Sequence, residues 1–279
     1  SCLFDRAGAG YSDVGPMPRT QDRLADELHA ALKGAGEKGP YVLIGHSAGG
    51  LQAAHFAHRY PGETAGVVVL DGSSPQHFSI EGRRYWGGRS LHQLATTLGA
   101  VFGVDVLVPS LHPLRAEGAR AAAIDPKDWE LLIEFEARPS ALAASQSLGD
   151  SDLASCFDTV RGRHVLGDIP VLSIVQADRT ADPREIEVVK KLFGLNDDQI
   201  RVWQAYRRAV QREYAEMSRK GRMVEMEPSM THLFPNEQPD YTTSMLREFL
   251  KPWSRESVKP PAPPTDAKSA APAKKIVHP

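Results

Sequence analysis

Short runs of apolar residues alternate with segments of helical periodicity over most of the chain. Four such runs have the length of strands and are mostly apolar: residues 41–44, 67–70, 169–175 and 223–226. Apolar runs of this kind are typical of strands that are buried on both faces of a parallel sheet. Because helical segments separate them, the pattern predicts an α/β fold with a mostly parallel sheet, flanking helices and right-handed crossovers.

The segments between these runs carry helix start and stop signals. Thr20 is placed to cap a helix whose apolar face recurs at Leu24, Leu28 and Leu32, and glycines at 34 and 36 end it. Further helices are predicted over residues 51–60, 183–218 and 241–250. At the N-terminus, residues 1–4 are interpreted as the end of another strand, followed by a glycine-rich turn.

The alternation of strands and helices stops between residues 77 and 168. Leu91, Leu94 and Leu98 suggest one helix there, and Asp125 followed by Pro126 starts another. We therefore predict a core in two parts, residues 1–76 and 169–253, interrupted by a helical lid at 77–168. Residues 254–279 are rich in Pro, Ala and Lys, a composition that predicts a disordered tail.

The charge balance excludes some classes of partner. The chain has 33 Lys and Arg against 35 Asp and Glu, with a pI near 6.6, so no basic field favours nucleic acid.

No apolar run approaches the roughly 20 residues that span a bilayer, and no signal peptide is recognisable. Two cysteines are too few for a disulfide framework. We expect a cytoplasmic protein, although a leader or anchor upstream of Ser1 stays open.

The strongest chemical signal is the pentapeptide from Gly45 to Gly49, which places Ser47 between a buried strand and a helix. A serine hydroxyl needs a base to take its proton, and a sharp strand-to-helix turn exposes it to one. Small residues are needed around such a turn, so Gly45 and Gly49 are assigned to it, and Gly50 adds room. His46 is expected to shape the pocket. The N–H of Ala48 faces the same point and is the predicted oxyanion donor.

These segments together resemble the α/β-hydrolase superfamily, especially its lid-bearing esterases and proline-iminopeptidase-like members. The resemblance rests on the turn from Phe4 to Ser12, the elbow from Gly45 to Gly50, and three later segments: Val69-Leu70-Asp71, Ile169-Pro170-Val171-Leu172 and Ser229-Met230-Thr231-His232. It implies a serine nucleophile, an acid and a histidine, in that order along the chain.

The resemblance also directs the choice of base and acid. His232 follows the last predicted strand and precedes the final helix, so it is the predicted base. The acid is expected after the strand at 169–175, where Asp178 is the first choice. Asp182, four residues on, and Asp71, at the end of the strand after the elbow helix, stay as alternatives.

No cofactor or metal is predicted. Gly8 and Gly10 suggest a dinucleotide-binding turn, but Asp13 stands where that motif needs a third glycine, and nearby prolines delay any helix. His55 and His58 lie one helical turn apart without a third ligand nearby.

Compared with the family, the first three strands and a helix are absent before the turn that begins this chain. The resemblance places the second oxyanion donor in that missing part, so no residue is assigned to it. We expect a fragment of a longer product; a truly shortened protein is the alternative.

The residues and the resemblance together predict a serine hydrolase that cleaves a carboxylic ester or related acyl bond of a small molecule. Aminopeptidase, lactonase and thioesterase activities use the same three residues and stay open. A hydrolase fold that has become a non-catalytic binding protein, or an inactive fragment, is the alternative of another class. Oligomeric state is not predicted.

Overall fold

The computed structural model describes residues 1–73, 125–136, 162–175, 196–227 and 232–254, together with single positions 138, 140, 141, 143, 144, 147, 186, 187 and 230. The chain divides into two compact units, Ser1–Pro239 and Asp240–Pro279. The first unit contains the sheet and all candidate site residues that the structure describes. The second contains most of helix α13 (Pro239–Leu250), followed by the 3-10 turn η4 (Lys251–Trp253).

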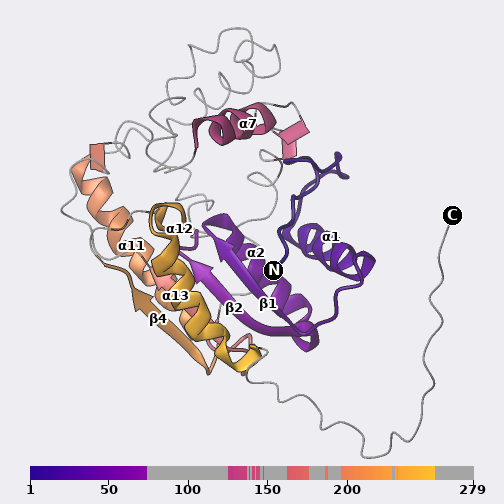
Figure 1. The fold of residues 1–279 in the computed structure, drawn as a ribbon. Coiled ribbons are helices and arrows are strands. Elements are labelled where there is room, and N and C mark those ends of the chain that lie inside the picture. Colours follow the sequence, from indigo (N-terminus) through magenta and orange to yellow (C-terminus); the bar gives the residue numbers. More distant parts are fainter. Residues whose placement is uncertain are drawn as a thin grey trace, which may run out of the picture. The chain divides into compact units, whose positions relative to one another are not determined.

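A four-stranded parallel sheet forms the centre of the first unit (Figure 1). Its strands are β1 (Tyr41–His46), β2 (Thr64–Leu70), β3 (Val171–Val175) and β4 (Gly221–Glu225), paired in sequence order. Leu43 is in register with Val67, and Val67 with Val171. The four strands and their parallel arrangement confirm the prediction. Because parallel strands end at one edge, the residues that follow β1, β2 and β4 are brought near each other.

The described helices follow the predicted signals. Helix α1 (Gln21–Gly34) is capped by Thr20, whose Oγ1 accepts from Arg23 N at 3.2 Å. Helix α2 (Ala48–Arg59) begins directly after Ser47, and the short helix η1 (Pro61–Glu63) leads into β2. Asp125 caps α7 (Pro126–Glu136) by accepting from Lys127 N at 2.8 Å. Helix α11 (Asp197–Glu216) precedes β4, and the one-turn helix α12 (Phe234–Glu237) follows it.

One face of the sheet is packed against helices. Helix α2 contacts β1 and β2, α11 contacts β3 and β4, and α1 packs on α2. Successive side chains of a strand point to opposite faces, so the residues of β1 to β3 that face these helices contribute to one core. The cluster combines these strand residues with buried helix residues, among them Leu43, Val67, Val69, Val171, Leu51, Phe56, Tyr214 and Met217. This packing fixes α2, and with it the position of Ser47.

The predicted strand at residues 1–4 is not observed. These residues have no regular structure, and Leu3 and Phe4 are exposed. A strand needs a neighbour to satisfy its backbone groups, and residues 1–4 pair with none of the described strands. The glycine-rich turn that follows is closed locally: Asp5 Oδ2 accepts from Tyr11 N at 3.1 Å, and a Cβ on Gly10 would overlap with the same carboxylate.

Several predictions fall outside the described residues. They include most of the lid at 77–168, its apolar candidates Leu91, Leu94 and Leu98, and nearly all of the tail at 254–279. No described helix combines the length and apolar character that crossing a membrane requires.

Candidate functional site

Ser47 occupies a sharp turn between β1 and α2. Its backbone has φ 55° and ψ −123°, outside the regions that L-residues ordinarily adopt. Three backbone hydrogen bonds hold it there: Ser47 N donates to Leu70 O at 3.0 Å, and Ser47 O accepts from Gly50 N at 3.0 Å and from Ser73 N at 2.9 Å. A strained conformation of this kind costs about 1–3 kcal/mol and persists only where the surroundings enforce it.

Two glycines, Gly45 and Gly50, leave the space that this turn needs. A Cβ on Gly45 would overlap with the backbone of Gly49, and a Cβ on Gly50 would lie 2.7 Å from Val69 Cγ1. A Cβ on Gly49 would meet no described atom within 4 Å. The tight positions of the turn are therefore Gly45 and Gly50, since Gly50 faces β2. The assignment of Gly45 and Gly49 to a catalytic elbow stays a prediction.

His232 and Asp71 form the best-defined polar contact of the site. His232 lies in the loop between β4 and α12, and Asp71 directly follows β2. Nδ1 of His232 is 2.6 Å from Oδ2 of Asp71. The Asp71 side chain is fully buried, whereas that of His232 is 35% exposed. A carboxylate only accepts hydrogen bonds, so this contact places the proton on Nδ1 and leaves Nε2 as the basic nitrogen.

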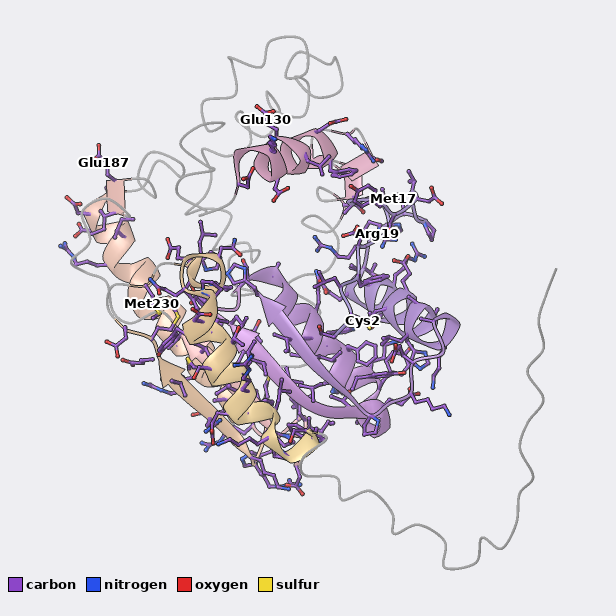
Figure 2. All side chains as sticks on the ribbon, viewed as in Figure 1. Cys2, Met17, Arg19, Glu130, Glu187 and Met230 are labelled. Carbon is purple, nitrogen blue, oxygen red and sulfur yellow. The ribbon has the colours of Figure 1, made fainter. Side chains whose placement is uncertain are left out.

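His46 supports the loop that carries His232. Its Nε2 lies 2.7 Å from the backbone oxygen of His232, and because a carbonyl only accepts, this nitrogen is the donor. The two imidazole rings are 4.6 Å apart, and the His46 ring also meets Phe234 edge-on. Met230, labelled in Figure 2, is buried in the same loop. These contacts place the His46 ring against the loop of His232, and its role in shaping a pocket stays a prediction.

The hydroxyl of Ser47 contacts a residue that the sequence analysis missed. Among the residues that the structure describes, Ser47 Oγ is hydrogen-bonded to Ser73 Oγ at 3.2 Å and not to His232. A sequence signal for Ser73 existed, because Asp71, Gly72 and Ser73 follow the strand next to the elbow strand. Polar residues at that edge of a parallel sheet are candidates for a site.

Ala48 is the first residue of α2, so its N–H lies among the helix N-terminal donors without an intrahelical acceptor.

Asp178 and Asp182, the other candidate acids, lie outside the described residues, and their assignment stays a prediction. Within the described part of the chain, no three His, Cys, Asp or Glu side chains are grouped closely enough to hold a metal ion.

This chain is similar in sequence and in structure to known proteins with an α/β-hydrolase fold. A family model described as "alpha/beta hydrolase fold" matches residues 1–127. The uncharacterized protein YbdG of Bacillus subtilis is 38% identical over 76 residues, which make up 27% of this chain and 23% of YbdG. An AB hydrolase superfamily protein of Gibberella zeae is 23% identical over 256 residues, or 89% of this chain and 77% of that protein.

The chain spans only 15% to 27% of the length of three curated relatives that it matches at 37% to 38% identity, YbdG among them. Among solved structures, a thermophilic esterase from Thermogutta terrifontis superimposes with a TM-score of 0.53 at 26% identity, over 88% of this chain and 78% of that one. The family match, the long relative and the structural likeness agree with the parallel sheet described above. The chain has the α/β-hydrolase fold, and the family model covers 127 of its 279 residues.

Proposed function

We propose that this protein is a serine hydrolase that cleaves a carboxylic ester or a related acyl bond through an acyl-enzyme on Ser47. The observation that carries the proposal is the contact of His232 Nδ1 with the buried Asp71, at the sheet edge where the Ser47 turn lies. An esterase at 26% identity supports the ester class of substrate. The proposed roles are nucleophile for Ser47, general base for His232 and orienting acid for Asp71.

In the proposed reaction, Ser47 Oγ attacks the acyl carbon while His232 Nε2 takes its proton. The Ala48 N–H donates to the oxygen of the tetrahedral intermediate, which then collapses as His232 protonates the leaving alcohol. Water, deprotonated by the same nitrogen, releases the acid and restores Ser47. Asp71 stays ionised throughout, and it stabilises the imidazolium and holds its orientation.

The proposal needs the Ser47 O–H to donate to His232 Nε2 when substrate is bound, while Ser47 Oγ keeps its contact with Ser73. A rotation about the Cβ–Oγ bond of serine redirects the proton without moving Oγ. Catalytic hydrogen bonds are often long or misaligned before substrate binds. The Ser47–Ser73 contact is therefore compatible with a resting enzyme.

Hydrolysis of p-nitrophenyl esters of two to eight acyl carbons tests the proposal. We expect turnover by the unmodified chain and a loss of about 10⁴-fold or more in Ser47→Ala. Ser12→Ala is the control, because it removes a partly exposed hydroxyl that donates to Asp5 O in the N-terminal turn. A rate that survives Ser47→Ala unchanged contradicts the assignment. A panel of amides, lactones and thioesters then separates the ester from the related acyl classes.

A further inference from the structure

Ser73 makes two contacts with the proposed nucleophile. Its Oγ is 3.2 Å from Ser47 Oγ, and its N–H donates to the carbonyl of Ser47 at 2.9 Å. The backbone hydrogen bond holds the two residues next to each other, and this brings the two hydroxyls within reach of one another. Ser73 is only partly buried, which leaves its hydroxyl at the surface of the site.

A chain of buried polar side chains holds the segment that carries Ser73. The Tyr214 hydroxyl donates to Ser73 O at 2.9 Å, and Gln211 Nε2 donates to Gly72 O at 2.6 Å. Ser173 Oγ in turn donates to Gln211 Oε1 at 2.8 Å. Tyr214, Gln211 and Ser173 are all completely buried. Burying three polar side chains costs free energy unless each finds a partner, and here two of the partners are the carbonyls of residues 72 and 73.

The fit between Tyr214 and this segment is also steric. A Cβ on Gly72 would lie 2.8 Å from Tyr214 Cε2, so the absence of a side chain at 72 lets the ring reach the Ser73 carbonyl. Helix α11, which carries Tyr214 and Gln211, thus fixes the loop after β2 from inside the core. Asp71, at the start of the same loop, is held through its backbone N–H, which donates to Ile174 O at 2.7 Å.

We propose that Ser73 is a further catalytic residue, which donates a hydrogen bond to Ser47 Oγ, and that Tyr214 and Gln211 are positioning residues that hold it there. This inference rests on the proposed function. As donor, Ser73 leaves the Ser47 proton available to His232 Nε2. It also stabilises the negative charge on Ser47 Oγ as that atom loses its proton during attack, and again as the C–Oγ bond breaks in deacylation. The Ser73 O–H bond itself never breaks.

The alternative is that Ser73 and Tyr214 only stabilise the loop. The two roles differ in how the variants combine. If Tyr214 acts through the Ser73 hydroxyl, Tyr214→Phe has nothing to position once that hydroxyl is removed. The two substitutions are then non-additive in kcat. If each only packs the loop, their effects multiply.

The test is a double-mutant cycle of Ser73→Ala and Tyr214→Phe, with kcat and KM measured on p-nitrophenyl butyrate. We expect Ser73→Ala to lower kcat about 5- to 10-fold, the range of one hydrogen bond, with KM nearly unchanged. Tyr214→Phe should lower kcat about 3-fold alone and have no effect in the Ser73→Ala background. Ser73→Thr, which keeps a hydroxyl, should recover most of the rate.

Three outcomes overturn the inference: wild-type kcat in Ser73→Ala, no advantage of Ser73→Thr over Ser73→Ala, or equal effects of Tyr214→Phe in both backgrounds. Tyr60→Phe is the matched control, because it removes a tyrosine hydroxyl bound to Asp26; it should keep full activity. Should Ser73→Ala not fold, Ser73→Cys keeps the size with a weaker donor and should still lower kcat. Retained turnover in Ser47→Ala defeats the proposed function instead, so the two failures are distinguishable.

Discussion

Nδ1 of His232 lies 2.6 Å from Oδ2 of Asp71, although 161 positions separate the two residues in the chain. Asp71 follows β2, the strand paired with the elbow strand β1. It reaches His232 with a side chain that has no exposed surface. Burying a carboxylate costs free energy unless hydrogen bonds replace its lost hydration. The contact with His232 supplies one such hydrogen bond to Asp71.

The first prediction compares the candidate acids. Asp71→Asn should lower kcat about 10³- to 10⁴-fold, because the amide at this position stabilises the wrong tautomer of His232. Asp178→Asn, the matched substitution at the alternative acid, should lower kcat less than about 10-fold. Steady-state kinetics of both variants on one ester decides between them. The reverse order of effects would return the acid to Asp178.

The second prediction concerns the glycines of the elbow. Gly45→Ala should destabilise the fold by about 3 kcal/mol or more, since its Cβ would overlap with the backbone of Gly49. Gly49→Ala should change the free energy of unfolding by about 1 kcal/mol at most, because alanine favours helix and no described atom is crowded. Urea denaturation of both variants measures the difference. Equal losses would show that the turn tolerates neither change.

The third prediction concerns His46. His46→Phe keeps a ring against His232 and Phe234 but removes the N–H that donates to the His232 carbonyl. It should lower kcat about 3- to 10-fold, as expected for one hydrogen bond that orients the base. His46→Ala removes the ring as well and should lower kcat further. If His46→Phe and His46→Ala are both as active as the unmodified chain, His46 has no part in holding His232.

The fourth prediction is a pH dependence of stability away from the site. Burial in α2 lowers the pKa of His55 below 6.5, although the hydrogen bond from its Nε2 to Asp22 at 2.7 Å opposes the shift. Between the folded and unfolded pKa values the unfolded chain binds more protons, so stability is full above pH 6.5 and falls as the pH drops through this window.

Unfolding free energies at about pH 7.5 and 5 test this sign. His55→Gln should lose less stability than the unmodified chain over that interval, because it removes the titrating group. His58→Gln, at an exposed histidine of the same helix, serves as the control and should follow the unmodified chain. A His55→Gln curve parallel to that of the unmodified chain would rule out His55 as the source.

Local signals were sufficient for most of the fold that the structure describes. The apolar runs predicted all four strands of the sheet, and the Thr20 and Asp125 caps predicted where α1 and α7 begin. These features depend on a few neighbouring residues. Residues 1–4 have no regular structure where the end of a strand was predicted, because a strand needs a partner and these residues pair with none of the described strands.

The candidate site was harder to predict because it depends on contacts across the sheet. Ser47 is marked by the glycines around it and His232 by its place after the last strand. The choice of acid has no local signature, since Asp71 and Asp178 both follow buried strands. Ser73 was missed for the same reason: its contact with Ser47 arises from the pairing of β1 with β2.

Ser47 is proposed to be a nucleophile that His232 activates. Intact-protein mass spectrometry after treatment with a fluorophosphonate ester tests it directly. We predict one added phosphonyl group in the unmodified chain, none in Ser47→Ala, and labelling slowed about 10³-fold or more in His232→Ala. An unlabelled chain that unfolds cooperatively, or a label that persists in Ser47→Ala, would contradict the account.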